Sequence, residues 1–274
     1  MQEVSVTVSK GGNQQVLRLI FPQSWNELSR QQLLFVADNW TSWQSILRIS
    51  ENLSKVRAIL VLALCGLKNK RQRLQLCKAL ALVNERSGAN ILECTDFLFQ
   101  NIDLTKNLLP TVNVGWFKKL YGPGDKLADL SVEEFSFAFG LFNQYNRTGN
   151  ETVLPTLMAC LYRPKNPDFA KTGELRSPFN NKLIDVNEKA IKTLPKPYHH
   201  AVYLYFLGCI EFLAKNYPNV FSRAESGSKG GGSFFDSVIA ISGGKFGPFD
   251  STKNTNLYII LRELERLIKE NNKK

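Results

Sequence analysis

The first residues of the chain alternate between apolar and polar side chains, as a half-buried β-strand does. Apolar residues stand at Val4, Val6 and Val8. Lys10–Asn13 then supplies turn-forming residues, and a second extended run covers residues 16–21. The pattern predicts an N-terminal β-hairpin.

Beyond residue 22 the apolar positions recur at helical spacing, and two helix starts carry a capping-box signature. Ser29 is followed by Gln32, and Ser131 is followed by Glu134. In such a box the serine side chain binds the amide three residues on, and the Gln or Glu side chain reaches back. We expect helices over residues 29–39, 42–52, 55–67, 72–85, 153–162, 198–216, 234–242 and 256–270, besides the one that begins at Ser131.

Phenylalanines mark the buried face of the helix that begins at Ser131. Phe135, Phe139 and Phe142 are spaced i, i+4, i+7 and therefore share one helix face. The predicted fold class is mainly α (α+β), with an N-terminal β-hairpin followed by a multi-helix bundle with long loops.

Composition shifts divide the chain into four predicted parts. Residues near 95–124 and 163–197 have little periodicity and are predicted to be extended loops, the first with one or two strands. Residues 226–233 have the Gly/Ser composition of a flexible linker. The predicted parts are an N-terminal hairpin (1–22), a helical body (23–221), a linker (222–233) and a C-terminal helical segment (234–274).

The overall composition is that of a globular protein. The 274 residues are 43% apolar and 22% charged, which excludes a wholly disordered, collagenous or membrane-embedded chain. The longest apolar runs, 56–67 and 201–214, are shorter than the roughly 20 residues of a spanning helix. Five widely spaced cysteines are typical of buried thiols in a reducing compartment, so we expect a cytoplasmic protein: Cys65, Cys77, Cys94, Cys160 and Cys209.

The sequence contains no complete motif for a catalytic, phosphate-binding or metal-binding site. The sequence Gly244-Lys245-Phe246 does not complete a phosphate-binding loop. The two histidines, His199 and His200, are adjacent, and no two cysteines stand in a C-x-x-C relation. We therefore expect a non-enzymatic protein without catalytic, cofactor-binding or metal-binding residues.

The net charge of +11 is the unusual number, and two stretches account for much of it. Residues 163–196 hold eight Lys and Arg against four acids. Such stretches can neutralise phosphates, but no nucleic-acid-reading motif accompanies them, so an acidic protein partner is favoured and nucleic-acid binding is the alternative. The other stretch is a candidate basic contact patch: Lys68, Lys70, Arg71, Arg73 and Lys78.

Four tryptophans lie near the ends of predicted elements. Large aromatic residues at such places either close a core or anchor an interface. The candidate interface aromatics are Trp25, Trp40, Trp43 and Trp116.

The later part of the chain resembles virion-morphogenesis proteins of bacteriophages and prophages, including tail-assembly chaperone-like products. The likeness covers residues 130–270 and rests on the apolar run 157–164, on Ser242–Gly247 and on the Asn-rich entry Thr252–Tyr258 into a charged helix. It implies a structural or assembly protein that contacts other virion or tail proteins or itself, in the host cytoplasm during assembly or in the virion. The N-terminal hairpin departs from the short all-helical chaperone pattern, so a connector or tail-associated component is the other reading.

Overall fold

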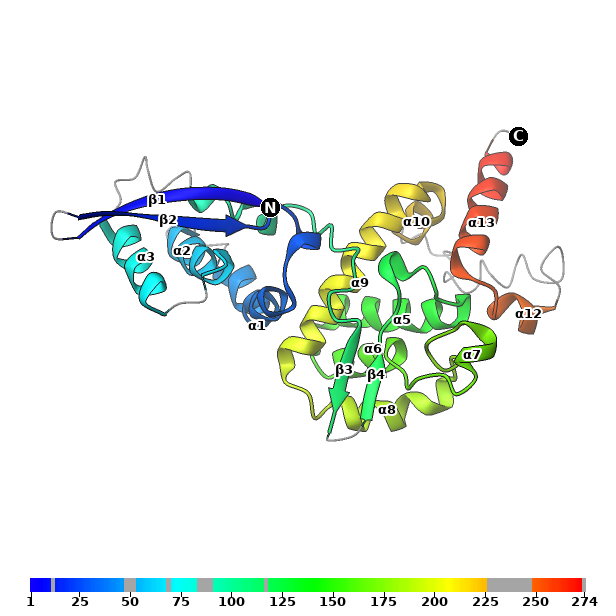
Figure 1. Ribbon diagram of the computed structural model, residues 1–274. Coiled ribbons are helices and arrows are strands. Elements are labelled where there is room, and N and C mark those ends of the chain that lie inside the picture. Colours follow the sequence, from blue (N-terminus) through cyan, green and yellow to red (C-terminus); the bar gives the residue numbers. More distant parts are fainter. Residues whose placement is uncertain are drawn as a thin grey trace. The chain divides into compact units, whose positions relative to one another are not determined.

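The computed structural model describes residues 1–10, 13–46, 53–67, 70–82, 91–115, 118–225 and 248–272. The described part is mainly α, as the sequence predicts, with two two-stranded sheets. The chain forms two compact units, Met1–Leu104 and Thr105–Lys274, here called the N-terminal unit and the C-terminal unit (Figure 1). None of the described helices has the length and apolar character that crossing a membrane requires.

The N-terminal unit opens with the predicted hairpin. Strands β1 (Gln2–Lys10) and β2 (Asn13–Phe21) pair antiparallel along their full length, from Gln2 opposite Phe21 to Lys10 opposite Asn13. Side chains on successive residues of β2 point to opposite faces. Leu17 and Leu19 are therefore buried, whereas Val16 and Ile20 are more than half exposed.

Helices α1 (Arg30–Ile46), α2 (Leu53–Leu64) and α3 (Lys70–Leu82) follow the hairpin. The predicted break between two helices at residues 39–42 is wrong, because α1 runs through it. Asn39 does not end the helix, since its side-chain amide donates to the carbonyl of Phe35, one turn back. The predicted helix ends at residues 47–52 and 83–85 lie outside the described residues.

At the end of the N-terminal unit, the segment around residues 96–103 contacts the segment that follows the hairpin. Short 3₁₀ helices η1 (Trp25–Glu27) and η3 (Asp96–Phe99) approach each other, and Asp103 accepts hydrogen bonds from the Trp25 amide (3.3 Å) and, through its carbonyl, from the Asn26 side chain (2.7 Å). This closure explains a boundary between Leu104 and Thr105, inside the stretch predicted as loop.

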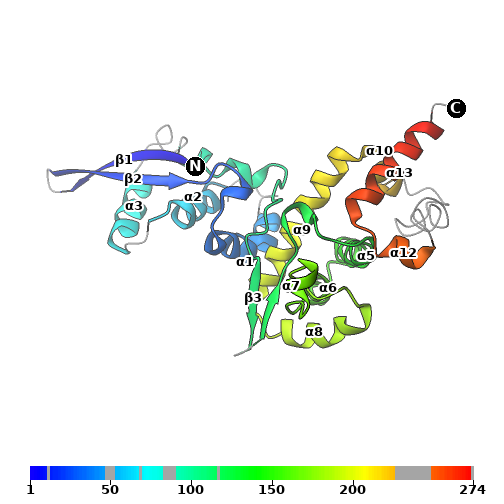
Figure 2. The same ribbon diagram turned by 45° about the vertical axis from the view of Figure 1, so that its right-hand side comes forward.

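The C-terminal unit is built around α6 (Val153–Leu161), a nine-residue helix of which eight residues are buried. Figures 1 and 2 show α6 between α5 (Val132–Thr148) and α8 (Ile184–Ile191), and α9 (Lys196–Asn216) also packs on α6. The remaining elements are β3 (Thr111–Val114), β4 (Lys118–Tyr121), η4 (Asp125–Leu127), α7 (Phe169–Thr172), η5 (Asn181–Leu183), α10 (Pro218–Glu225), α12 (Phe249–Lys253) and α13 (Leu257–Asn271).

The prediction of one long connecting segment over residues 163–197 is wrong. The segment contains α7, η5 and α8, and α8 buries Ile184, Asn187 and Ile191 against the unit. The periodicity is hard to see in the sequence because one of the three buried positions is an asparagine. Residues 95–124 hold the strands β3 and β4, within the expected one or two.

The C-terminal helix α13 packs back on its own unit. The Leu257 amide donates to the Leu130 carbonyl (2.9 Å), and the Val132 amide donates to the Thr255 carbonyl (3.0 Å). These bonds join the segment directly to the start of α5. The predicted linker at 226–233 and the predicted helix at 234–242 lie outside the described residues.

Candidate functional site

The predicted basic patch lies on one helix of the N-terminal unit. Its described residues are all exposed on α3, whereas Leu76 of the same helix is fully buried. Among them stands Leu74, whose side chain is 57% exposed. We call this surface the α3 basic face; it consists of Lys70, Arg71, Arg73, Leu74 and Lys78. Lys68 lies outside the described residues.

The other basic stretch, residues 163–196, does not form a comparable surface. Two of its eight cations, Arg163 and Arg176, are buried. Ion pairs within or next to the stretch engage Lys171 with Asp168 (3.6 Å), Lys192 with Glu188 (2.7 Å) and Lys196 with Glu151 (3.0 Å). Much of the positive charge counted in the sequence is therefore balanced locally.

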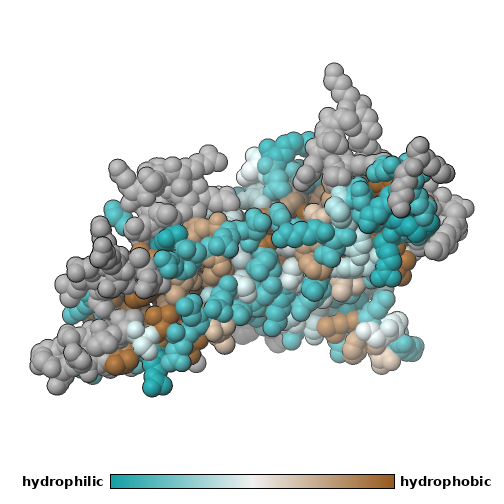
Figure 3. All heavy atoms as spheres, turned by 90° about the horizontal axis from the view of Figure 1, so that it is seen from above, coloured by the Kyte–Doolittle hydropathy of each residue, from teal (hydrophilic) through white to brown (hydrophobic). Residues whose placement is uncertain are grey.

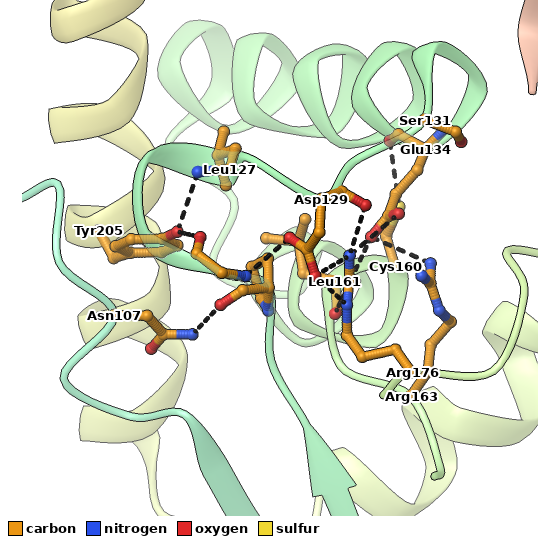
Figure 4. Close-up of polar contacts among 12 residues, drawn as sticks. Asn107, Leu127, Asp129, Ser131, Glu134, Cys160, Leu161, Arg163, Arg176 and Tyr205 are labelled. Atoms are coloured by element: carbon orange, nitrogen blue, oxygen red, sulfur yellow. Dashed lines mark hydrogen bonds and ion pairs between the residues drawn. The ribbon is translucent and has the colours of Figure 1, made fainter. Parts of the chain in front are cut away.

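The two buried arginines meet at one buried carboxylate, Glu134, whose side chain is 1% exposed (Figure 4). The Arg176 guanidinium spans both oxygens of Glu134, with Nη1 donating to Oε1 and Nη2 to Oε2. Arg176 also donates through Nε to Asp129 (3.1 Å) and through Nη1 to the Leu161 carbonyl (2.9 Å). Nη1 of Arg163 lies 3.0 Å from Oε1 of Glu134 on its other side.

The local fold explains how Glu134 comes to lie inside. Ser131 caps α5 as predicted, because its hydroxyl accepts a hydrogen bond from the Glu134 amide (3.2 Å). The second half of the predicted capping box is not formed by the Glu134 side chain, which instead binds the two arginines. Arg163 follows the last turn of α6 and is fixed by paired backbone bonds with Tyr121 of β4 (2.8 and 3.0 Å).

Burial controls the electrostatics of this cluster. It raises the pKa of Glu134, and the Arg176 and Arg163 guanidinium groups oppose that shift. For Arg176 the burial is outweighed by Glu134 and Asp129, which raise its pKa, whereas burial lowers the pKa of Arg163. Arg176 is thus the better compensated of the two cations.

Two cavities adjoin the cluster. The larger, about 810 Å³, is lined by Arg176 and by three acids, Asp129, Glu134 and Glu174. The smaller, about 200 Å³, is mostly apolar. Four residues line both cavities and so form the wall between them: Arg163, Ser177, Pro178 and Phe179.

The cysteines and histidines do not assemble into a reactive group. Four cysteines are buried as expected, but Cys77 is exposed, contrary to the prediction. Burial raises the pKa of Cys160, whose Sγ lies 3.6 Å from the Glu134 carbonyl, which keeps it a thiol. His199 contacts the Ile191 carbonyl through Nε2 (3.1 Å), and His200 lies 3.8 Å from Glu151. Within the described ranges no group of three His, Cys, Asp or Glu residues is placed to hold a metal ion.

The tryptophans of the N-terminal unit close its core. Trp25 is fully buried, stands edge-on to Trp40 (5.6 Å between ring centroids) and donates through Nε1 to the Phe97 carbonyl (3.2 Å). Trp43 is 6% exposed and Trp40 is half-buried. Trp25 and Trp43 therefore take the core role, and only Trp40 retains exposed area for a contact. Trp116 lies outside the described residues.

Sequence reasoning missed the members of the Glu134 cluster. The sequence pattern predicts a capping role for Glu134 and places Arg163 and Arg176 in a basic stretch that is expected to contact a partner. One signal was present: Arg163 directly follows the apolar helix predicted over 153–162, a place where a cation is costly unless it is paired.

Comparison with protein-family models, with curated proteins and with solved structures finds no match. The case for function therefore depends on the residues and contacts described above.

Proposed function

We propose that this protein is a non-enzymatic bacteriophage structural or assembly protein, either a tail-assembly chaperone or a connector or tail-associated component, that acts through protein–protein contacts. The resemblance of residues 130–270 supports the phage setting. The α3 basic face supports the mode of action, and it is the observation on which the proposal depends.

The α3 basic face has the composition of a protein-binding surface. Lys70, Leu74 and Lys78 are spaced four residues apart and lie in one row along the helix. An exposed leucine between cations fits a partner with an apolar spot inside an acidic rim, which is the common anatomy of protein interfaces. A phosphate backbone has no apolar counterpart for Leu74.

A second apolar surface lies in the same unit. Val16 and Ile20 are 57% and 51% exposed on the outer face of the hairpin. Figure 3 shows hydrophobic residues, in brown, gathered on the surface of the N-terminal unit among hydrophilic ones. Exposed apolar area of this kind favours contact with other proteins.

Co-purification tests the proposal. We would express the full chain together with the virion genes that neighbour its own and purify it at physiological salt. We expect a stable complex that is lost when Lys70, Arg71 and Lys78 are all changed to Glu. A matched control changes three exposed lysines of the C-terminal unit, Lys165, Lys182 and Lys189, to Glu and keeps the complex. A wild-type chain that stays monomeric by light scattering and retains no neighbour contradicts the proposal.

The alternative is a nucleic-acid-binding accessory protein that uses the same cations. Leu74→Ser separates the two, because the side chain is exposed and its loss leaves the charge unchanged. A protein partner is expected to bind this variant more weakly, whereas binding to duplex DNA in a gel shift depends on the cations and falls steeply with salt. DNA binding that is steep in salt and indifferent to Leu74→Ser would favour the alternative.

A further inference from the structure

Arg163 separates two cavities that differ in charge. The larger cavity contains Asp129, Glu134 and Glu174 among its lining residues. The smaller cavity, here called the Arg163 pocket, has Arg163 and Lys118 as its only charged lining residues within the described part of the chain. The arginines that line the larger cavity already face acids there, whereas the Arg163 pocket offers an anion two cations and no acid among its described lining residues.

Arg163 has hydrogen-bonding capacity that its surroundings leave unfilled. Its side chain is only 9% exposed, and its Nη1 lies 3.0 Å from Glu134 Oε1. Both Nε and Nη1 are buried without a well-aligned hydrogen bond to the described residues. Leaving a charged donor buried and unpaired is costly. Guanidinium nitrogens form a planar fork that matches the two oxygens of a carboxylate.

The Glu134 cluster does not account for Arg163 by itself. Arg176 already spans both oxygens of Glu134 and also binds Asp129. The second arginine adds one ion pair at 3.0 Å and keeps its Nε unused. A group bound next to Arg163 would supply the missing acceptor.

Apart from Arg163, Lys118 and three uncharged polar residues, the lining of the Arg163 pocket is apolar. Phe179 lies under the guanidinium, 5.6 Å from ring centroid to Cζ, and Ile184 is a buried part of the lining. Leu183 and Val186 line the pocket and are 50% and 58% exposed. Lys118 is held by a hydrogen bond from its Nζ to Asn187 (3.3 Å).

We propose that the Arg163 pocket binds a carboxylate that is joined to a short apolar group. The carboxylate binds Arg163 and Lys118, and the apolar group packs against Leu183 and Val186. Two sources share this chemistry: a free aliphatic acid, and the last residue of a protein chain with an apolar side chain. The volume of about 200 Å³ limits the bound part to a small group.

Calorimetric titration of the full chain with matched probes tests the pocket. The probes are N-acetyl-leucine and N-acetyl-leucinamide, which have the same shape but end in a charged carboxylate and a neutral carboxamide, and a short peptide ending in leucine as the free acid or the amide. We expect each acid to bind about tenfold or more tightly than its amide, since a charge-assisted bond of about 1.5–3 kcal/mol corresponds to at least that ratio. A peptide acid that binds more tightly than N-acetyl-leucine identifies a chain terminus as the source, and equal affinity identifies a free acid.

Variants connect the binding to the named residues. Arg163→Gln is expected to remove the preference for the acid, and Val186→Ser to weaken acid and amide alike. Lys165→Gln removes a neighbouring exposed cation that does not line the pocket and is expected to bind as the wild type does. If Arg163→Gln does not fold, Lys118→Gln serves in its place, with several-fold weaker acid binding and unchanged amide binding.

Three results would overturn the proposal. The acid and the amide could bind alike, no probe could show saturable binding, or the foldable variants at Arg163 and Lys118 could bind the acid as the wild type does. The charge-reversed α3 variant is expected to bind the probes normally, so the pocket and the α3 basic face are tested separately.

Discussion

Two stretches of the chain are rich in cations, and they differ in how many of these cations are exposed and how many are buried or ion-paired. On α3 the four described cations of the basic face are exposed. In residues 163–196 two cations are buried at Glu134 and three are engaged in ion pairs with Asp168, Glu188 and Glu151. A count of charges along the sequence does not distinguish the two cases.

The difference comes from where the acids are. No acidic residue occurs in α3 (Lys70–Leu82), so no carboxylate of the helix itself balances its positive charge. The 163–196 stretch carries four acids of its own, and the fold brings Glu134, Asp129 and Glu151 to it from other elements. Among the described residues, α3 combines four exposed cations with no acid in the same helix, and this favours the N-terminal unit as the contact surface.

The largest expected effect is a loss of stability when a buried cation of residues 163–196 is removed. Arg176→Met removes the main compensation of a carboxylate that is 1% exposed, so we expect the C-terminal unit to lose about 3–5 kcal/mol of unfolding free energy. Hydrogen exchange of the α5 and α6 amides measures the loss locally. Lys78→Met on α3 is the matched control and is expected to change little. Equal losses of stability from the two changes would contradict the distinction between buried, ion-paired cations in residues 163–196 and exposed cations on α3.

The two faces of α3 give the next contrast. Leu76 is fully buried and Leu74 is 57% exposed, two residues apart in one helix. We expect Leu76→Ala to cost about 2–5 kcal/mol and Leu74→Ala no more than about 0.5 kcal/mol. Denaturant unfolding followed by tryptophan fluorescence reports mainly on this unit, which holds three of the four tryptophans, and Trp116→Phe removes the signal of the other unit. A large loss from Leu74→Ala would show that this leucine belongs to the core and not to the α3 basic face.

A smaller effect on stability is expected from the cap of α5, the helix that carries Glu134. Ser131→Ala removes the hydroxyl that accepts the Glu134 amide at the start of α5, and we expect a loss of about 1 kcal/mol. Faster hydrogen exchange in the first turn of α5 is the measurement. Ser136→Ala, further along the same helix, removes a hydroxyl that only donates to the Val132 carbonyl, and it serves as the control. Equal exchange in the two variants would contradict a capping role for Ser131.

The smallest effect on stability concerns the exposed ion pair between Lys196, in residues 163–196, and Glu151. A hydrogen bond from Lys196 holds the pKa of Glu151 below its ordinary value. Because the folded pKa is lowered, the pair stabilises the fold fully above the ordinary pKa of a glutamate, and this stabilisation is lost as the pH falls through the lowered value. Both side chains are substantially exposed, so a few tenths of a kcal/mol are involved.

An NMR titration of the Glu151 carboxyl group checks this pair. We expect Lys196→Ala to raise the pKa of Glu151 toward the ordinary value. Lys182→Ala, on an exposed lysine without a described ion pair, is expected to leave it unchanged. An unchanged pKa in Lys196→Ala would show that the charges of the 163–196 stretch are balanced less locally than the contacts indicate.

Local signals predicted much of the fold, and the two capping boxes show how far such signals reach. Both serines mark real helix starts. Gln32 completes its box, because its Oε1 accepts a hydrogen bond from the Ser29 amide (2.8 Å) and its backbone amide donates to the Ser29 hydroxyl (3.3 Å). Its side-chain amide also donates to the Leu64 carbonyl (2.9 Å). Glu134 has the same sequence position and a different role, because two arginines compete for its side chain.

The missed features share a physical cause, which is the dependence on contacts between distant residues. Arg176 and Glu134 are 42 residues apart, and their pairing depends on the path of the chain through α7. The boundary after Leu104 depends on hydrogen bonds between Asp103 and the residues Trp25 and Asn26, which lie 78 and 77 residues earlier in the chain. Neither periodicity nor composition encodes such returns of the chain.

The turn that carries Asp129 depends on the late part of the chain. Lys126 and Leu127 adopt left-handed conformations (φ of 58° and 59°), which are unfavourable for side chains of this kind. Hydroxyl groups from α9 and α13 hold them: Tyr205 accepts the Leu127 amide (3.3 Å), and Tyr258 donates to the Lys126 carbonyl across 132 residues of sequence (2.6 Å).

During synthesis, residues 124–129 therefore leave the ribosome long before the tyrosine that secures them. Long-range contacts of this kind form late, since a large loop has to close first. We expect the Glu134 cluster to reach its final form only after residue 258 has emerged, whereas the N-terminal unit is a compact unit formed by the first 104 residues. The unit that carries the α3 basic face would then be folded while the second unit is still incomplete.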